Sequence, residues 1–116
     1  MHTAPITVVE TPTFQRKVKA LLSEEERLDL ITYLAENPTS GALIEGTGGV
    51  RKARWARQGA GKSGGYRVIY YFHSTTIPLF ALLIYGKNDK ENLTQAEKNA
   101  ICKLTSLLDK YGSKTL

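Results

Sequence analysis

The sequence predicts an α+β fold: an N-terminal strand and two helices, an antiparallel sheet of about four strands, and a C-terminal helix. Three observations support this class. Apolar residues recur at helical spacing near both ends of the chain. β-Branched and aromatic residues dominate its middle, and glycine-rich stretches separate the middle segments. The 116 residues have the length of one domain, so we expect a single domain over 1–116 with the helices on one face of the sheet.

The first third of the chain carries the signals of one strand and two helices. β-Branched residues at Ile6–Val9 predict the strand. Thr11-Pro12 supplies an N-cap and a proline at the first helical position, and an apolar helical stripe follows. Ser23 and Glu26 form a capping-box pattern for the second helix, which ends at Asn37-Pro38 because the residue before a proline avoids the helical region. We therefore expect two short antiparallel helices.

Three middle segments predict strands, and one further pattern predicts the last helix. The strand segments are 50–57 (VRKARWAR), 66–73 (YRVIYYFH) and 79–85 (LFALLIY). The stretch ARQGAGKS at 56–63 is close to a phosphate-binding loop, but that loop needs a helix after it, and position 66 begins a strand pattern. A second capping box at Thr94 and Glu97 opens an amphipathic C-terminal helix.

The positive charge is concentrated in one segment of the chain. The whole chain carries 16 basic and 11 acidic residues, but Gly46 to Asn88 contains no Asp or Glu and seven cations. The rest of the chain has nine basic and eleven acidic residues. A polyanion is the natural partner of such a segment, nucleic acid first.

Composition also excludes several classes of protein. Cys102 is the only cysteine, so neither an intramolecular disulfide nor a cysteine-based zinc site can form, and we expect a reduced, cytoplasmic protein. The longest apolar run, Ile77–Tyr85, is too short for the ~20 residues of a membrane span, and no signal-peptide pattern is visible. No His-x-x-x-His or carboxylate–histidine pattern is present, so we expect no metal and no cofactor.

The candidate site is a basic strand face. On adjacent antiparallel strands, Lys52, Arg54 and Arg67 can project from one side. Lys87 follows the end of a third strand, while Arg57 and Lys62 flank or occupy the glycine-rich connection. Arginine forks match phosphate oxygens and lysine adds a point charge, so the cluster suits a phosphate. The alternative interpretation is a solvated sheet face with nothing bound.

Aromatic residues alternate with these cations. Strand parity places Trp55, Tyr66, Tyr70 and Phe72 in the core. Tyr71 shares its parity with Arg67, so it is the best candidate to stack on an unpaired base. Tyr85 lies beside Lys87 and is a second candidate.

The basic segment resembles a known family of toxins. The similarity is carried by GTGGVRKARWARQGAGKSGGYRVIYYF and the following LLIYGKND, from Gly46 onward. In this order of motifs the chain resembles the RelE/HigB superfamily of type II toxin–antitoxin toxins, and its HigB-like branch in particular. The resemblance implies a RelE-like fold and a ribosome-dependent endoribonuclease that cleaves mRNA in the 30S A site and inhibits translation. It also implies a cognate antitoxin, which we expect to be a HigA-like helix-turn-helix protein.

The resemblance extends to individual site residues. Lys52 and Arg54 match the paired cations of the first basic strand, Arg67 matches the arginine after the glycine loop, and Lys87 matches the lysine after the last strand. The family pattern has a further arginine where this chain has Asn88, which we assign to RNA binding together with Arg57, Lys62, Tyr71 and Tyr85.

Cleavage through attack of a 2′-hydroxyl on the neighbouring phosphate assigns a role to each cation. Arg54 and Arg67 would stabilise the pentavalent transition state. Lys52 is the candidate general base, because neighbouring cations disfavour a further positive charge. Lys87 could stabilise the phosphate or protonate the leaving 5′-oxygen. Two other functions remain open on the same fold: a ParE-like DNA gyrase inhibitor, and a nucleic-acid-binding protein without catalysis.

Overall fold

The computed structural model describes residues 6–56, 65–86 and 92–114. These residues form three helices and a five-stranded sheet with the strand order β1-β5-β4-β3-β2. In chain order the elements are β1 (Val8–Glu10), α1 (Pro12–Leu21), α2 (Glu24–Glu36), β2 (Ala42–Leu43), β3 (Val50–Trp55), β4 (Tyr66–Tyr71), β5 (Leu79–Gly86) and α3 (Gln95–Lys114). The predicted α+β class is confirmed. The sheet is mixed rather than antiparallel, because β1 runs parallel to β5.

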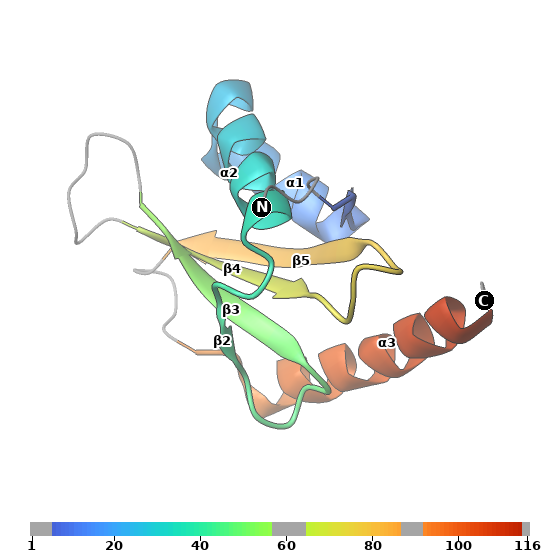
Figure 1. Cartoon of the computed structure of the whole chain (residues 1–116). Coiled ribbons are helices and arrows are strands. Elements are labelled where there is room, and N and C mark those ends of the chain that lie inside the picture. Colours follow the sequence, from blue (N-terminus) through green and yellow to red (C-terminus); the bar gives the residue numbers. More distant parts are fainter. Residues whose placement is uncertain (1–5, 57–64, 87–91, 115–116) are drawn as a thin grey trace.

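Helices cover both faces of the sheet, so the expectation that they lie on one face is wrong. α1 and α2 lie on one side and α3 lies on the other (Figure 1). The reason is the central strand β4, in which all six residues are buried. A strand that is buried along its whole length needs cover on both faces.

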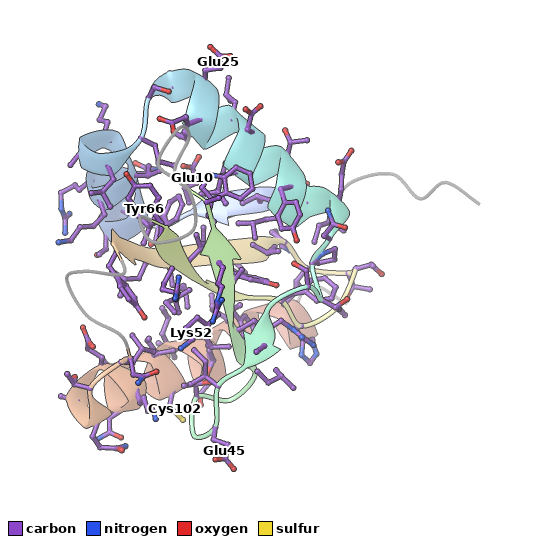
Figure 2. All side chains as sticks on the ribbon, turned by 90° about the vertical axis from the view of Figure 1, so that its left-hand side faces the viewer. Glu10, Glu25, Glu45, Lys52, Tyr66 and Cys102 are labelled. Atoms are coloured by element: carbon purple, nitrogen blue, oxygen red, sulfur yellow. The ribbon has the colours of Figure 1, made fainter. Side chains whose placement is uncertain are left out.

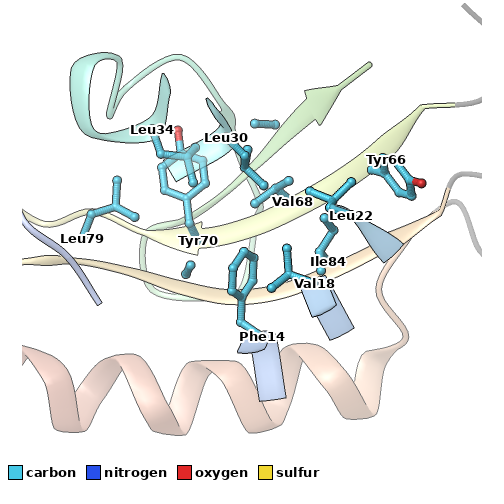
Figure 3. Close-up of a cluster of buried hydrophobic side chains, with 12 residues drawn as sticks. Phe14, Val18, Leu22, Leu30, Leu34, Tyr66, Val68, Tyr70, Leu79 and Ile84 are labelled. Carbon is cyan, nitrogen blue, oxygen red and sulfur yellow. The ribbon is translucent and has the colours of Figure 1, made fainter. Parts of the chain in front are cut away.

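The core on the side of α1 and α2 is the larger of the two. Alternate strand residues such as Val68, Tyr70 and Ile84 pack there against Phe14 and Leu34 of the two helices (Figure 3). The Tyr70 hydroxyl, which is buried, accepts a bond from Gly41 N and donates one to Pro38 O, both at 2.9 Å. The segment between α2 and β2 is thereby fixed to the central strand.

The core on the side of α3 is built from the other set of strand residues. Val50, Ile69 and Tyr71 are its most deeply buried members. Ile101 and Leu104 of α3 pack against it. None of the helices in the described ranges is both long enough and apolar enough to cross a membrane.

The helix starts follow the predicted caps. Thr11 Oγ1 accepts from Phe14 N at 3.3 Å and donates to Ala81 O at 3.1 Å, so the cap of α1 also ties that helix to β5. Both reciprocal bonds of the capping box at Ser23 and Glu26 are present. β4, a strand and not a helix, begins at Tyr66, as the argument against a phosphate-binding loop requires.

Candidate functional site

The strand register brings three of the predicted cations to one face of the sheet. Arg54 on β3 is the direct partner of Arg67 on β4, and Arg67 is in turn the partner of Tyr85 on β5. Residues directly opposite each other on antiparallel strands project to the same side, with Cβ atoms about 5 Å apart. Lys52 lies two residues from Arg54 and therefore on that side as well. We call Lys52, Arg54 and Arg67 the cationic cluster.

The cationic cluster lies on the α3 side of the sheet, next to the core formed there. Arg67 has the same parity as Ile69 and Tyr71, which pack in that core. Figure 2 shows Lys52 on the side of α3 and Tyr66 on the side of α1 and α2. The cluster thus continues the α3-side face towards the end of β3 and the start of β4.

The three cations differ in depth. Arg54 is exposed, Lys52 is half-buried, and Arg67 is only 4% exposed. The Arg67 Nη1 atom lies 3.5 Å from the backbone oxygen of Tyr66. A cation held away from bulk water interacts more strongly with a bound anion than an exposed one does. The arrangement can therefore bind a phosphate between a fixed inner guanidinium and an outer one that reaches solvent.

Lys52 has a partner that the sequence did not indicate. Its Nζ donates to Asn92 Oδ1 at 3.1 Å, across 40 residues of sequence. Asn92 precedes α3 and lies outside every motif considered above. Only the packing of α3 against the sheet reveals the contact.

The two tyrosines predicted to stack on bases are buried, so that prediction is wrong. Tyr71 is 1% exposed and packs in the α3-side core, with its ring stacked on His73 at a centroid distance of 6.3 Å. Tyr85 does face the same side as Arg67, but it is 6% exposed. The parity argument gave the correct side of the sheet, but α3 covers that side. By contrast, Trp55, Tyr66, Tyr70 and Phe72 pack in the core, as predicted.

The glycine-rich turn before β3 is a structural element of the site. Thr47 is fully buried, and its Oγ1 donates to Ile44 O and accepts from Val50 N. Thr105 of α3 donates to Thr47 O at 3.0 Å. Gly48 has a φ of +78°, and a Cβ at that position would lie 2.6 Å from Thr105 Oγ1. This turn therefore attaches α3 to the strand that carries the cations.

Four predicted site residues lie outside the described residues. They are Arg57, Lys62, Lys87 and Asn88. Their assignments stay predictions from the sequence.

A separate cavity of about 450 Å³ lies between α1 and α2. Among its lining residues are the cations Arg16, Lys19 and Arg27. Arg27 donates to both Glu10 and Glu24, and the bond to the Glu10 carboxylate raises the pKa of the guanidinium. Because two carboxylates already satisfy Arg27, this cavity is a weaker phosphate site than the cationic cluster.

Comparison with solved structures identifies the type of fold. The chain is similar to the free state of a doubly substituted E. coli toxin RelE, with a TM-score of 0.55 and 14% sequence identity. The match covers 76% of this chain and 90% of that toxin. The molecule therefore has the fold of a small α+β toxin.

A family comparison gives the assignment. The model of the RelE toxin of the RelE/RelB toxin–antitoxin system matches residues 6–116. The chain belongs to the RelE toxin family and is a toxin of a toxin–antitoxin system.

Proposed function

We propose that this toxin is a metal-independent, ribosome-dependent endoribonuclease of the HigB-like branch, which cleaves mRNA in the A site and so inhibits translation. The observation that carries the proposal is the direct pairing of Arg54 with Arg67 on the face that also holds Lys52. Residues directly opposite each other on a sheet hold their side chains close together, so the two guanidinium groups can contact one ligand. The oxygens of a phosphodiester match the fork geometry of guanidinium groups.

In this reaction the 2′-hydroxyl attacks the adjacent phosphorus, and the bond to the 5′-oxygen of the next nucleotide breaks. Arg67 and Arg54 stabilise the charge that develops on the phosphate oxygens. Lys52 takes the proton from the 2′-hydroxyl, and Lys87 gives a proton to the departing 5′-oxygen. Arg57, Lys62 and Asn88 hold the RNA backbone on either side of the scissile bond.

The ribosome would align the RNA substrate, which the cationic cluster alone does not do. Three cations bind and stabilise a phosphate, but they do not align the attacking hydroxyl with the bond that breaks. An mRNA held in the A site is already ordered, which removes much of the entropic cost of reaching that geometry. We therefore expect slow cleavage of free RNA and fast cleavage on programmed ribosomes.

The deciding experiment is cleavage of mRNA by the purified full chain on programmed ribosomes, with the breaks mapped by primer extension. We expect breaks within the A-site codon and growth arrest on expression. Arg67→Ala should lower the cleavage rate by about 10²- to 10³-fold, the effect of removing one donor to a transition-state oxyanion. Arg16→Ala, which removes an exposed cation on α1, is the matched control and should cut normally.

Three results would contradict the proposal. Growth arrest with intact mRNA and double-strand breaks in DNA would indicate a gyrase inhibitor instead. Absence of growth arrest would indicate a binding protein without catalysis. An Arg67→Ala variant that folds, as judged by its thermal unfolding, and keeps full toxicity would remove Arg67 from the site.

We also propose that the toxin acts in the cytoplasm and is neutralised there by a HigA-like helix-turn-helix antitoxin. An acidic segment of the antitoxin would complement the cationic cluster. Co-expression of a small adjacent open reading frame should restore growth, and purified antitoxin should stop the cleavage of mRNA on ribosomes. Continued growth arrest with a soluble, co-expressed helix-turn-helix partner would argue against this type of antitoxin.

A further inference from the structure

The contact between Lys52 and Asn92 is the one hydrogen bond within the described residues that joins the cationic cluster to α3's leading segment. The lysine ammonium has three N–H donors, and Asn92 Oδ1 accepts one of them at 3.1 Å. Among the described residues, no carboxylate forms an ion pair with Lys52; the ion pairs there belong to Arg27. The acceptor that orients Lys52 is therefore a neutral amide.

Asn92 is itself held firmly, although its side chain is exposed. The next residue, Leu93, is buried in the α3-side core. Immediately after it, Thr94 N donates to Glu97 Oε1 at 2.8 Å and Glu97 N donates to Thr94 Oγ1 at 3.1 Å, which fixes the start of α3. A backbone anchored on one side by a buried leucine and a cap loses little freedom when its side chain binds a partner.

A second attachment fixes the distance between the two elements. Thr105, further along α3, donates to Thr47 O in the turn that leads into β3. Two bonds thus join these segments: Thr105–Thr47 links the middle of α3 to the turn before β3, and Lys52–Asn92 links β3 to the residues that precede α3. The Lys52 amine is held relative to Arg54 and Arg67 by contacts to a separate element.

The residue type at position 92 decides whether Lys52 is held by a charged or by a neutral acceptor. A carboxylate there would favour the ammonium form of Lys52, which cannot take the proton of the 2′-hydroxyl. A carboxamide oxygen is uncharged, so it orients one N–H of Lys52 and leaves the amine able to take the proton of the 2′-hydroxyl. A neutral acceptor can therefore orient the Lys52 amine without forming an ion pair with it.

We propose that Asn92 is a positioning residue for Lys52, which holds the lysine amine on the face of β3 where Arg54 and Arg67 bind the scissile phosphate. Its consequence for catalysis rests on the proposed nuclease function, but the positioning itself can be measured without catalysis.

The first measurement is acetylation of the folded full chain by acetic anhydride, followed by mass spectrometry. The labelling of Lys52 is expressed relative to the exposed Lys103 in the same sample. Asn92→Ala should raise this ratio on the order of threefold to tenfold, the change expected for losing one net hydrogen bond. Asn99→Ala removes an exposed asparagine of α3 that accepts from Gln95, and it should leave the ratio unchanged.

The second measurement is single-turnover cleavage on programmed ribosomes with the same variants. Asn92→Ala should slow the cleavage step several-fold at an unchanged half-saturating ribosome concentration, because the amine is misplaced and not the RNA. Asn92→Asp should keep Lys52 protected from acetylation and still cleave slowly, because the carboxylate holds the side chain as an ammonium, which cannot act as a base. Asn99→Ala should cleave like the unmodified chain.

The two measurements test the positioning role of Asn92 separately from the proposed nuclease function. Equal acetylation of Lys52 in the unmodified chain, Asn92→Ala and Asn99→Ala would overturn the positioning role. Increased acetylation with an unchanged cleavage rate would overturn it too, because the contact would then have no consequence for the reaction. If Asn92→Ala exposes Lys52 but the unmodified chain never cuts mRNA, the positioning of the amine stands and the nuclease proposal fails.

Discussion

Arg67 combines a formal charge with almost complete burial, and it lies on the central strand of the sheet between Arg54 and Tyr85. Strands on both sides fix its backbone, and burial restricts the conformations of its side chain. Arg54, its partner across β3 and β4, is exposed. We therefore expect the site to need a guanidinium group more strictly at position 67 than at position 54.

We expect lysine to replace Arg54 far better than Arg67. A lysine ammonium is strongly hydrated and lacks the planar fork, so it is poorly suited to the buried position. Arg67→Lys should lower the cleavage rate by about 10- to 100-fold, and Arg54→Lys by less than about tenfold. Single-turnover cleavage on programmed ribosomes measures both, with thermal unfolding as the check on folding. Equal losses would show that burial does not distinguish the two sites.

Residue-level features of the site were only partly predictable from the sequence. Alternation along a strand was enough to place Lys52, Arg54 and Arg67 on one side, because the period of two is a property of any strand. It could not show that α3 covers that side at Tyr71 and leaves it open at Arg54, since this depends on where the helix docks. The partner of Lys52 is 40 residues away, and no local pattern points to Asn92.

At the scale of elements, the docking of α3 depends on the turn before β3. Gly46 and Gly48 both adopt left-handed φ values, +77° and +78°. A Cβ on Gly46 would meet nothing within 4 Å, whereas a Cβ on Gly48 would lie 2.6 Å from Thr105 Oγ1. Because the two φ values are nearly equal, comparing alanine substitutions at Gly46 and Gly48 separates the cost of backbone strain from the cost of displacing α3.

Gly48→Ala should destabilise the protein more than Gly46→Ala. Both substitutions introduce left-handed strain of about 1–2 kcal/mol. Gly48→Ala also displaces Thr105 from Thr47, which adds about 0.5–1.5 kcal/mol. Urea denaturation at an unchanged slope gives the two free energies of unfolding. Equal losses for the two alanine variants would mean that the Thr105 contact does not hold α3.

The first residues of two helices were predictable because the sequence contains a capping-box pattern before each of them. Ser23 with Glu26, and Thr94 with Glu97, form the bonds that their spacing predicts. β2 was missed because a strand of two residues carries no periodic signal. The parallel pairing of β1 with β5 joins segments about 70 residues apart, and local sequence does not specify such a partner.

The whole molecule carries a net charge of +5, and its acid-free segment supplies the strands that bear the cationic cluster. Binding of single-stranded RNA should therefore weaken as salt rises. For about five neutralised phosphates, the log–log slope of affinity against salt should be roughly −3 to −4. Fluorescence anisotropy with a short labelled RNA measures it, and Arg54→Gln should reduce the slope by about 0.7. A flat response would argue against the basic face as an RNA platform.

The position of β1 at the edge of the sheet has a consequence for biosynthesis. β1 is made first, but it pairs with β5, and the Thr11 cap bonds to Ala81 and Leu82 of that late strand. Contacts this distant along the chain form only after the whole intervening segment is available. The cap of α1 therefore cannot form its bonds to the sheet until β5 has emerged from the exit tunnel. The complete sheet, and with it the fold of the toxin, can therefore form only late in the synthesis of the chain.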